Sequence, residues 1–118
     1  MLAPERAPYP RAPFAHVGYW QRVLAGPRGK VVLAQWSAAC EVQFTYLVTT
    51  GKPELRQLFP QHPALALGWT SEGLARVELL EPIHGTRTRI GMHAGIYLVT
   101  PRGHVVRLER RLPPARGC

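Results

Sequence analysis

The chain has 118 residues, of which 46% are hydrophobic, and its formal net charge at pH 7 is +8. This length suits a single domain, and the hydrophobic content argues against wholesale disorder. No apolar stretch approaches the roughly 20 residues that a bilayer-spanning helix needs, and the N-terminus lacks the apolar core of a secretory signal. We therefore expect a cytoplasmic protein, or a periplasmic or extracellular one if the chain is a fragment of an exported protein.

The polar residues argue against most familiar catalytic sites. All acidic residues are Glu, and the chain contains neither Asp nor Asn, so the usual side chains of Ca²⁺ loops, catalytic triads and phosphoryl-transfer sites are missing. Neither Ser37 nor Ser71 lies in a Gly-x-Ser-x-Gly motif. Cys40 and Cys118 lack the spacing of a zinc or thioredoxin-like site. We expect no enzymatic activity, no metal and no cofactor.

In the first half, the frequent prolines predict that residues 1–14 form an extended arm rather than a helix or strand. Four strands follow, separated by turns at residues 26–29 and 51–53 and by a loop at residues 38–40. The strands are predicted at residues 17–24, 30–37, 41–50 and 55–59. The third strand gives the strongest signal, because apolar residues at positions 42, 44, 46 and 48 would share one face.

The second half repeats this order of elements. Strands are predicted at residues 65–70, 75–81, 95–100 and 104–109. Turns fall at residues 71–73 and 101–103, Pro82 ends the second of these strands, and residues 83–94 form a polar loop. Ala75, Val77 and Leu79 should face one way, opposite to Arg76 and Glu78. No segment shows helical periodicity over three turns, so we expect little helix.

The same four-residue segment, Tyr-Leu-Val-Thr, occurs at residues 46–49 and again at residues 97–100. Such self-similarity indicates structural repeats, here about residues 16–59 and 64–110, within one all-β domain of residues 15–110. The predicted fold is two antiparallel four-stranded, blade-like meanders that form a partial β-propeller or a sandwich. The Pro-rich arm and a basic tail at residues 111–118 are predicted to be disordered.

Each half carries a turn, an aromatic strand, a Gly turn and a Leu-bearing strand. The second half shows these as residues 69–73 (WTSEG), 95–99 (GIYLV), 103 (G) and 107–108 (RL), and the first half as residues 26–29 (GPRG), 45–48 (TYLV), 51 (G) and 57–58 (QL). The pattern resembles the TolB-like, WD40-like repeats of bacterial β-propellers. The resemblance implies protein–protein contact and no catalytic residue. Because two blades cannot close a ring, it also implies a fragment, a homo-oligomer or two sheets packed face to face.

The basic residues point to a binding function. Beyond residue 84, Glu109 is the only acid, and the loop at residues 83–94 is an insertion of the kind that often contacts partners. We expect a non-enzymatic protein–protein interaction module. The alternative is a small basic β-barrel that binds single-stranded nucleic acid, if aromatic residues such as Trp20 and Trp36 are exposed rather than in the core. The candidate binding residues are His84, Arg87, Arg89, His93, Arg102, Arg107, Arg110 and Arg111.

Overall fold

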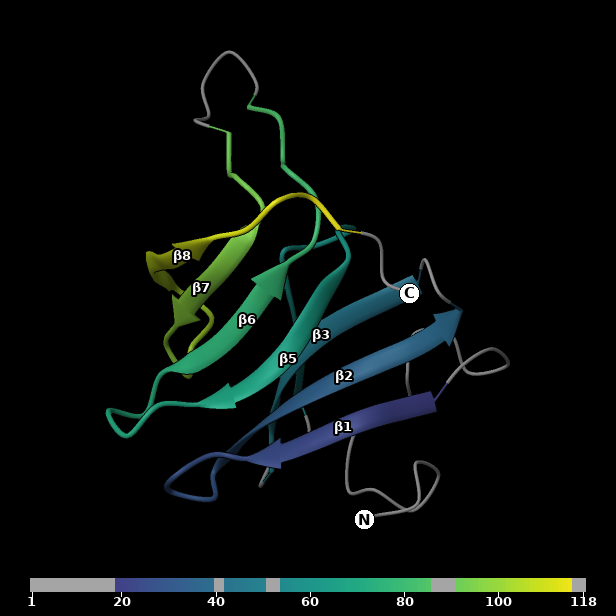
Figure 1. Cartoon of the computed structure of the whole chain (residues 1–118). Helices are drawn as coiled ribbons and strands as arrows, with labels where there is room; N and C mark the ends of the chain where they lie inside the picture. Colours follow the sequence, from purple (N-terminus) through teal and green to yellow (C-terminus); the bar gives the residue numbers. More distant parts are fainter. Residues whose placement is uncertain (1–18, 40–41, 51–53, 86–90, 116–118) are drawn as a thin grey trace.

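Eight β-strands form two antiparallel sheets (Figure 1). The structure is a computed structural model that describes residues 19–39, 42–50, 54–85 and 91–115, and these residues contain no helix. The strands are β1 (Tyr19–Ala25), β2 (Val31–Ala39), β3 (Val42–Thr49), β4 (Glu54–Leu58), β5 (Ala64–Trp69), β6 (Ala75–Leu79), β7 (Gly95–Val99) and β8 (Val105–Arg111). The N-terminal sheet has the order β1-β2-β3-β4 and the C-terminal sheet β5-β6-β7-β8. The predicted fold class of two four-stranded meanders is confirmed.

The observed strand ends differ slightly from the prediction. The predicted loop at residues 38–40 is wrong in its first part, because β2 continues to Ala39 and pairs with β3, with a register shift between Ser37 and Ala39. Two alanines offer no turn chemistry, and a bulge lets the strand continue through them. Residues 1–14, predicted as a disordered arm, lie outside the described residues. Of the predicted tail, residues 111–115 are described, and the Leu112 and Ala115 N–H groups donate to the Ala94 and Leu80 carbonyls at 3.2 and 2.8 Å.

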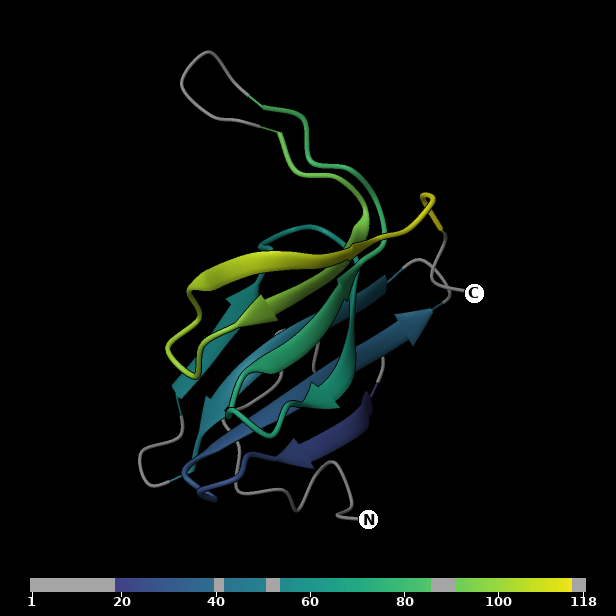
Figure 2. The same ribbon diagram turned by 60° about the vertical axis from the view of Figure 1, so that its left-hand side comes forward.

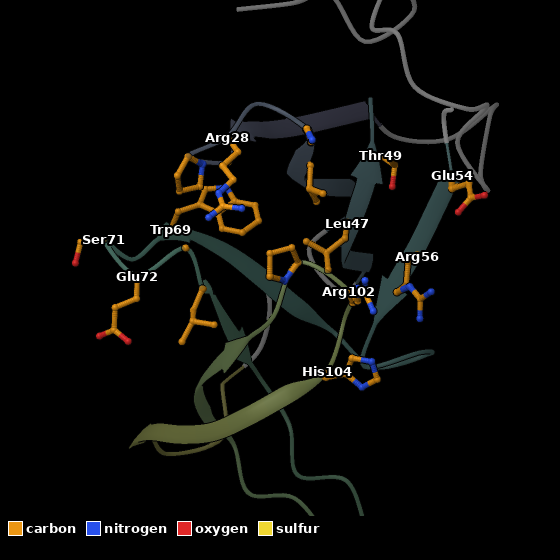
Figure 3. Close-up of a pocket in the computed structure, with 17 residues that line it drawn as sticks. Arg28, Leu47, Thr49, Glu54, Arg56, Trp69, Ser71, Glu72, Arg102 and His104 are labelled. Atoms are coloured by element: carbon orange, nitrogen blue, oxygen red, sulfur yellow. The ribbon is translucent and has the colours of Figure 1, made fainter. Parts of the chain in front are cut away.

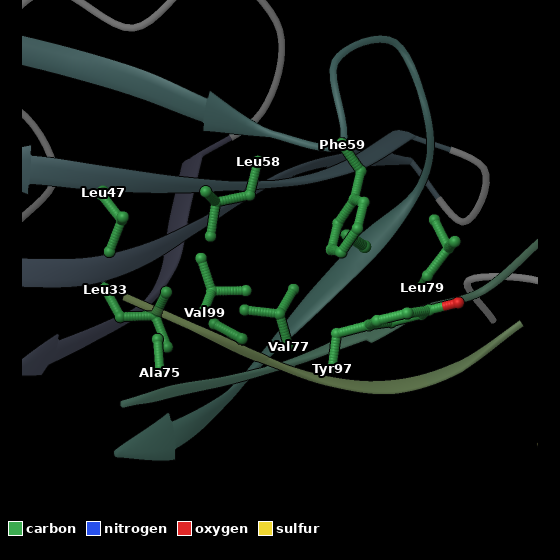
Figure 4. Close-up of a cluster of buried hydrophobic side chains, with 11 residues drawn as sticks. Leu33, Leu47, Leu58, Phe59, Ala75, Val77, Leu79, Tyr97 and Val99 are labelled. Carbon is green, nitrogen blue, oxygen red and sulfur yellow. The ribbon is translucent and has the colours of Figure 1, made fainter. Parts of the chain in front are cut away.

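The main core lies between the two sheets, which form two layers (Figure 2). In a strand, alternate side chains point to opposite faces, so each sheet directs one apolar set toward the other. The predicted alternation in β6 is confirmed, since Ala75, Val77 and Leu79 are fully buried while Arg76 is exposed. Figure 4 shows these side chains meeting those of the N-terminal sheet. The buried members of the core are Leu33, Leu47, Leu58, Phe59, Ala64, Ala66, Ala75, Val77, Leu79, Tyr97 and Val99.

A second cluster lies on the opposite face of the N-terminal sheet. Trp20 packs edge-to-face on Trp36 and Tyr46, with ring centroids 5.2 and 5.7 Å apart. All three side chains are buried, and no described residue accepts a hydrogen bond from the Trp36 indole N–H. Burial raises the pKa of Tyr46 from 10.0 to about 12. These aromatic rings therefore belong to the protein interior.

The sheets approach each other most closely at β5, which contacts β1, β2 and β3. As the first strand of the C-terminal sheet, β5 has one edge without a neighbouring strand, and side chains of the N-terminal sheet bond to it. The Thr45 hydroxyl donates to the Ala64 carbonyl at 2.9 Å, and Arg22 donates to the Ala66 carbonyl at 2.9 Å. The Ala66 N–H donates to Gln35 Oε1 at 3.1 Å. This side of the sandwich is thereby closed.

Candidate binding groove

Three hairpin turns of the same construction lie around one hollow. In each, a glycine at the fourth turn position donates its N–H to the carbonyl of the first residue and has a positive φ. Glycine adopts this conformation without the steric cost that other residues meet. The bonds are Gly29 to Gly26 at 3.0 Å, Gly73 to Thr70 at 3.0 Å and Gly103 to Thr100 at 2.9 Å, and the φ angles of the three donating glycines are 67°, 83° and 91°.

Two of these turns carry cationic side chains. Residues 27–29 and 101–103 both read Pro-Arg-Gly, and proline suits the second turn position because its φ is already fixed. The residue after the motif is Lys30 in the first turn and His104 in the second, and two valines follow in both cases. The duplicated motif therefore places Arg28 and Arg102 at the same hollow.

The hollow at these turns has a volume of about 890 Å³, and we call it the cationic hollow. Figure 3 shows Arg28 and Trp69 on one side of it and Arg56, Arg102 and His104 on the other. The ends of β3 and β4 complete the lining. The charged residues are Arg28, Lys30, Arg56 and Arg102 against the two carboxylates Glu54 and Glu72.

Trp69 forms a fixed wall of the cationic hollow. Its indole N–H donates to the Leu24 carbonyl at 2.9 Å, which ties β5 to β1. A Cβ atom at Gly26 would lie 2.7 Å from the Val31 carbonyl oxygen and 3.2 Å from the Trp69 ring, so a larger residue at position 26 would displace one of them. The ring is half-buried and held by its edge, which leaves little freedom to move toward a ligand.

A second hollow of about 620 Å³ continues beyond Arg56. Its lining is mostly apolar, with His62 and His84 among the remaining residues, and we call it the apolar hollow. Arg56 borders both hollows and lies over Gly103, where a Cβ atom would come within 2.6 Å of Arg56 Cδ. The two hollows therefore meet at Arg56 and form one groove along β4. The apolar lining residues are Leu58, Phe59, Pro60, Ile83, Met92, Val99 and Val105.

The described part of the β6–β7 loop contributes to the apolar hollow. Ile83 and Met92 form an isolated antiparallel bridge with two backbone hydrogen bonds of 2.8 Å. Near the base of the loop, the Tyr97 hydroxyl donates to the His93 carbonyl at 2.7 Å. Burial raises the pKa of Tyr97, and the positive charge of Arg111 partly opposes the effect. The loop base is thus held to β7, and its bridge faces β4 across the groove.

The structure brings only part of the predicted binding surface together. Arg102 lines the cationic hollow and His84 the apolar hollow, while Arg87 and Arg89 lie outside the described residues. His93 and the arginines of β8 are exposed but do not border either hollow. The three arginines of β8 pair with residues of β7: Arg107 with Leu98, Arg110 with Ile96 and Arg111 with Gly95.

Sequence reasoning missed several residues of the groove. The density of basic residues along the sequence pointed to β8. The cationic side chains of the groove instead come from separate segments that lie close together only in the folded protein. The duplicated Pro-Arg-Gly motif was the available signal for Arg28 and Arg102. Nothing comparable marks Arg56, whose position depends on how the two sheets pack. The missed residues are Arg28, Lys30, Glu54, Arg56, His62, Trp69, Met92 and His104.

No protein-family model, curated protein or solved structure matches the chain. The TolB-like resemblance therefore stays a prediction. Among the described residues, no three His, Cys or Glu side chains gather as metal ligands. The same residues include no helix with the length and apolar character needed to cross a membrane.

Proposed function

We propose that this chain is a non-enzymatic interaction module that binds an acidic segment of a protein partner in the cationic hollow. The observation that carries the proposal is the meeting of four Lys and Arg side chains, from two turns and β4, around one hollow with two carboxylates. A concave site of one dominant sign concentrates the electrostatic potential and attracts ligands of opposite charge. Arg guanidinium groups also bind carboxylates through two parallel hydrogen bonds.

A protein partner is favoured over single-stranded nucleic acid because most of the described aromatic side chains are buried or lie away from the cationic hollow. Nucleic-acid binding of this kind needs rings on which bases can stack beside the phosphate contacts. Trp20 and Trp36 are buried, and Trp69 is fixed in the groove wall. Tyr19 is 51% exposed, but it begins β1, at the opposite end of that strand from the cationic hollow. The hollow thus offers one aromatic wall, Trp69, rather than the several exposed rings on which successive bases stack.

The test compares two double variants that change the net charge equally. Arg56→Glu with Arg102→Glu reverses charge in the groove, and Arg107→Glu with Arg110→Glu reverses it on β8. Fluorescein-labelled octaglutamate is titrated with each protein at low ionic strength, and anisotropy reports binding. We expect the groove variant to bind at least about tenfold more weakly than the native chain, and the β8 variant to stay within about threefold.

Two outcomes would overturn the proposal. One is no binding of octaglutamate to the native chain at low ionic strength. The other is an equal loss in both double variants together with tighter binding of an oligothymidine, which would support nucleic-acid binding through overall charge. Circular dichroism of each variant shows whether the β-sheet signal is retained.

A further inference from the structure

The edge of β4 has no partner strand among the described residues. β4 pairs with β3 through five residue pairs and is the last strand of the N-terminal sheet. An edge strand exposes backbone N–H and C=O groups that can pair with another extended chain. The corresponding edge of β5 is bonded to Thr45, Gln35 and Arg22, whereas none of the side-chain hydrogen bonds between described residues reaches β4. Within the part of the chain that the structure describes, this edge of β4 is therefore open for strand addition.

The groove follows this edge along the length of the strand. Glu54 and Arg56 border the cationic hollow, and Arg56, Gln57 and Leu58 border the apolar hollow. Five strand residues extend over about 17 Å, so a bound segment of five or six residues would cover both hollows. The facing wall changes along the same path, from Arg102 and His104 at one end to apolar residues at the other.

The two hollows require different side chains from one ligand. The cationic hollow suits carboxylates, and the apolar hollow suits aliphatic side chains that would contact Leu58, Ile83 and Val105. In an added strand, backbone hydrogen bonds supply affinity, and side chains entering pockets supply specificity. An extended peptide with acidic residues at one end and alternating aliphatic residues at the other meets both requirements.

We infer that the acidic segment of the partner binds as an added β-strand on β4, with its carboxylates in the cationic hollow and an aliphatic side chain in the apolar hollow. This inference rests on the proposed function and goes further by naming the backbone conformation and composition of the ligand. Three observations together select this ligand. They are the edge of β4 that no described strand pairs with, the path of the groove along that edge, and the change from a cationic to an apolar lining.

The first test uses a labelled peptide, Glu-Glu-Glu-Val-Thr-Val, and its reversed sequence, with the tighter binder taken forward. Two N-methylated forms of that peptide are then compared, one methylated at odd positions and one at even positions. An added strand pairs with its neighbour through alternate residues, so one form should bind at least about tenfold more weakly and the other about as well as the parent. Equal binding of all three forms would overturn strand addition and leave the proposed function standing. If neither peptide direction nor octaglutamate binds, the proposed function fails as well.

The second test uses two adjacent valines of β8. Val105 lines the apolar hollow and Val106 does not, although they are 45% and 48% exposed. Val105→Glu should weaken peptide binding at least about fivefold because it places a carboxylate beside the aliphatic side chain of the ligand, and Val106→Glu should change binding by less than about twofold. Equal effects of the two substitutions would remove the apolar hollow from the ligand site.

Discussion

The edge of β5 in the C-terminal sheet and the edge of β4 in the N-terminal sheet show how one two-sheet sandwich can be closed on one side and open on the other. At β5, side chains from the inner face of the N-terminal sheet bond directly to the free backbone groups of Ala64 and Ala66. At β4, the neighbouring space is a groove lined by charged and apolar side chains. The difference depends on which residues of the N-terminal sheet point inward. Amide and hydroxyl groups face β5, and Arg56 and Leu58 face the groove.

A buried polar network supports the closed side. Gln35 is 2% exposed, and its Nε2 donates to Gln21 Oε1 at 2.9 Å and to Gln43 Oε1 at 3.0 Å. Its Oε1 accepts the N–H of Ala66 at 3.1 Å. Buried polar groups stabilise a fold when their hydrogen bonds are satisfied and become costly when a partner is removed. Gln35 therefore joins β1, β2 and β3 to the edge of β5.

The largest expected effect comes from breaking this network. Gln35→Ala should lower the free energy of unfolding by about 3 kcal/mol, because it leaves the Ala66 N–H without its acceptor and creates a cavity. Urea denaturation followed by circular dichroism measures the change. A loss below about 0.5 kcal/mol would show that the network does not stabilise the closed side.

A pH effect is expected on the far face of the N-terminal sheet, away from both edges. Burial raises the pKa of Tyr46, so the folded state retains its proton where the unfolded state has lost it. Stability should be unaffected by this group below pH 10 and should fall between pH 10 and 12, by up to about 2 kcal/mol. Comparison with Tyr46→Phe isolates the effect. If both proteins lose the same stability over this range, Tyr46 is not the group responsible.

The smallest effect separates the two Pro-Arg-Gly turns. Gly29→Ala and Gly103→Ala should each cost about 1 kcal/mol of stability, because both glycines have a positive φ. A Cβ at position 29 meets no atom within 4 Å, whereas at position 103 it meets Arg56. Only Gly103→Ala should therefore displace Arg56 and weaken octaglutamate binding, by about threefold. Equal affinities of the two variants would contradict the placement of Arg56 across Gly103.

Much of the fold could be predicted from the sequence because strand signals are local. Alternation in β6 and the glycine turns depend on residues adjacent in the chain, and the eight strands followed from them. The contact of β5 with the N-terminal sheet could not be predicted, since it depends on Gln35 and Thr45 meeting a strand that lies far along the chain. The groove was missed for the same reason. Arg56 and Arg102 come together only when the sheets pack, whereas charge density alone pointed to Arg107 and Arg110.

Backbone hydrogen exchange at β4 tests the central claim most directly. Amide exchange rates are measured by NMR with and without saturating Glu-Glu-Glu-Val-Thr-Val, or its reversed sequence if that binds more tightly. Binding as an added strand predicts at least about tenfold slower exchange for amides of Arg56, Gln57 or Leu58 that do not already pair with β3, with β8 unchanged. Protection confined to β8, or tight binding with no slowing anywhere in β4, would contradict it.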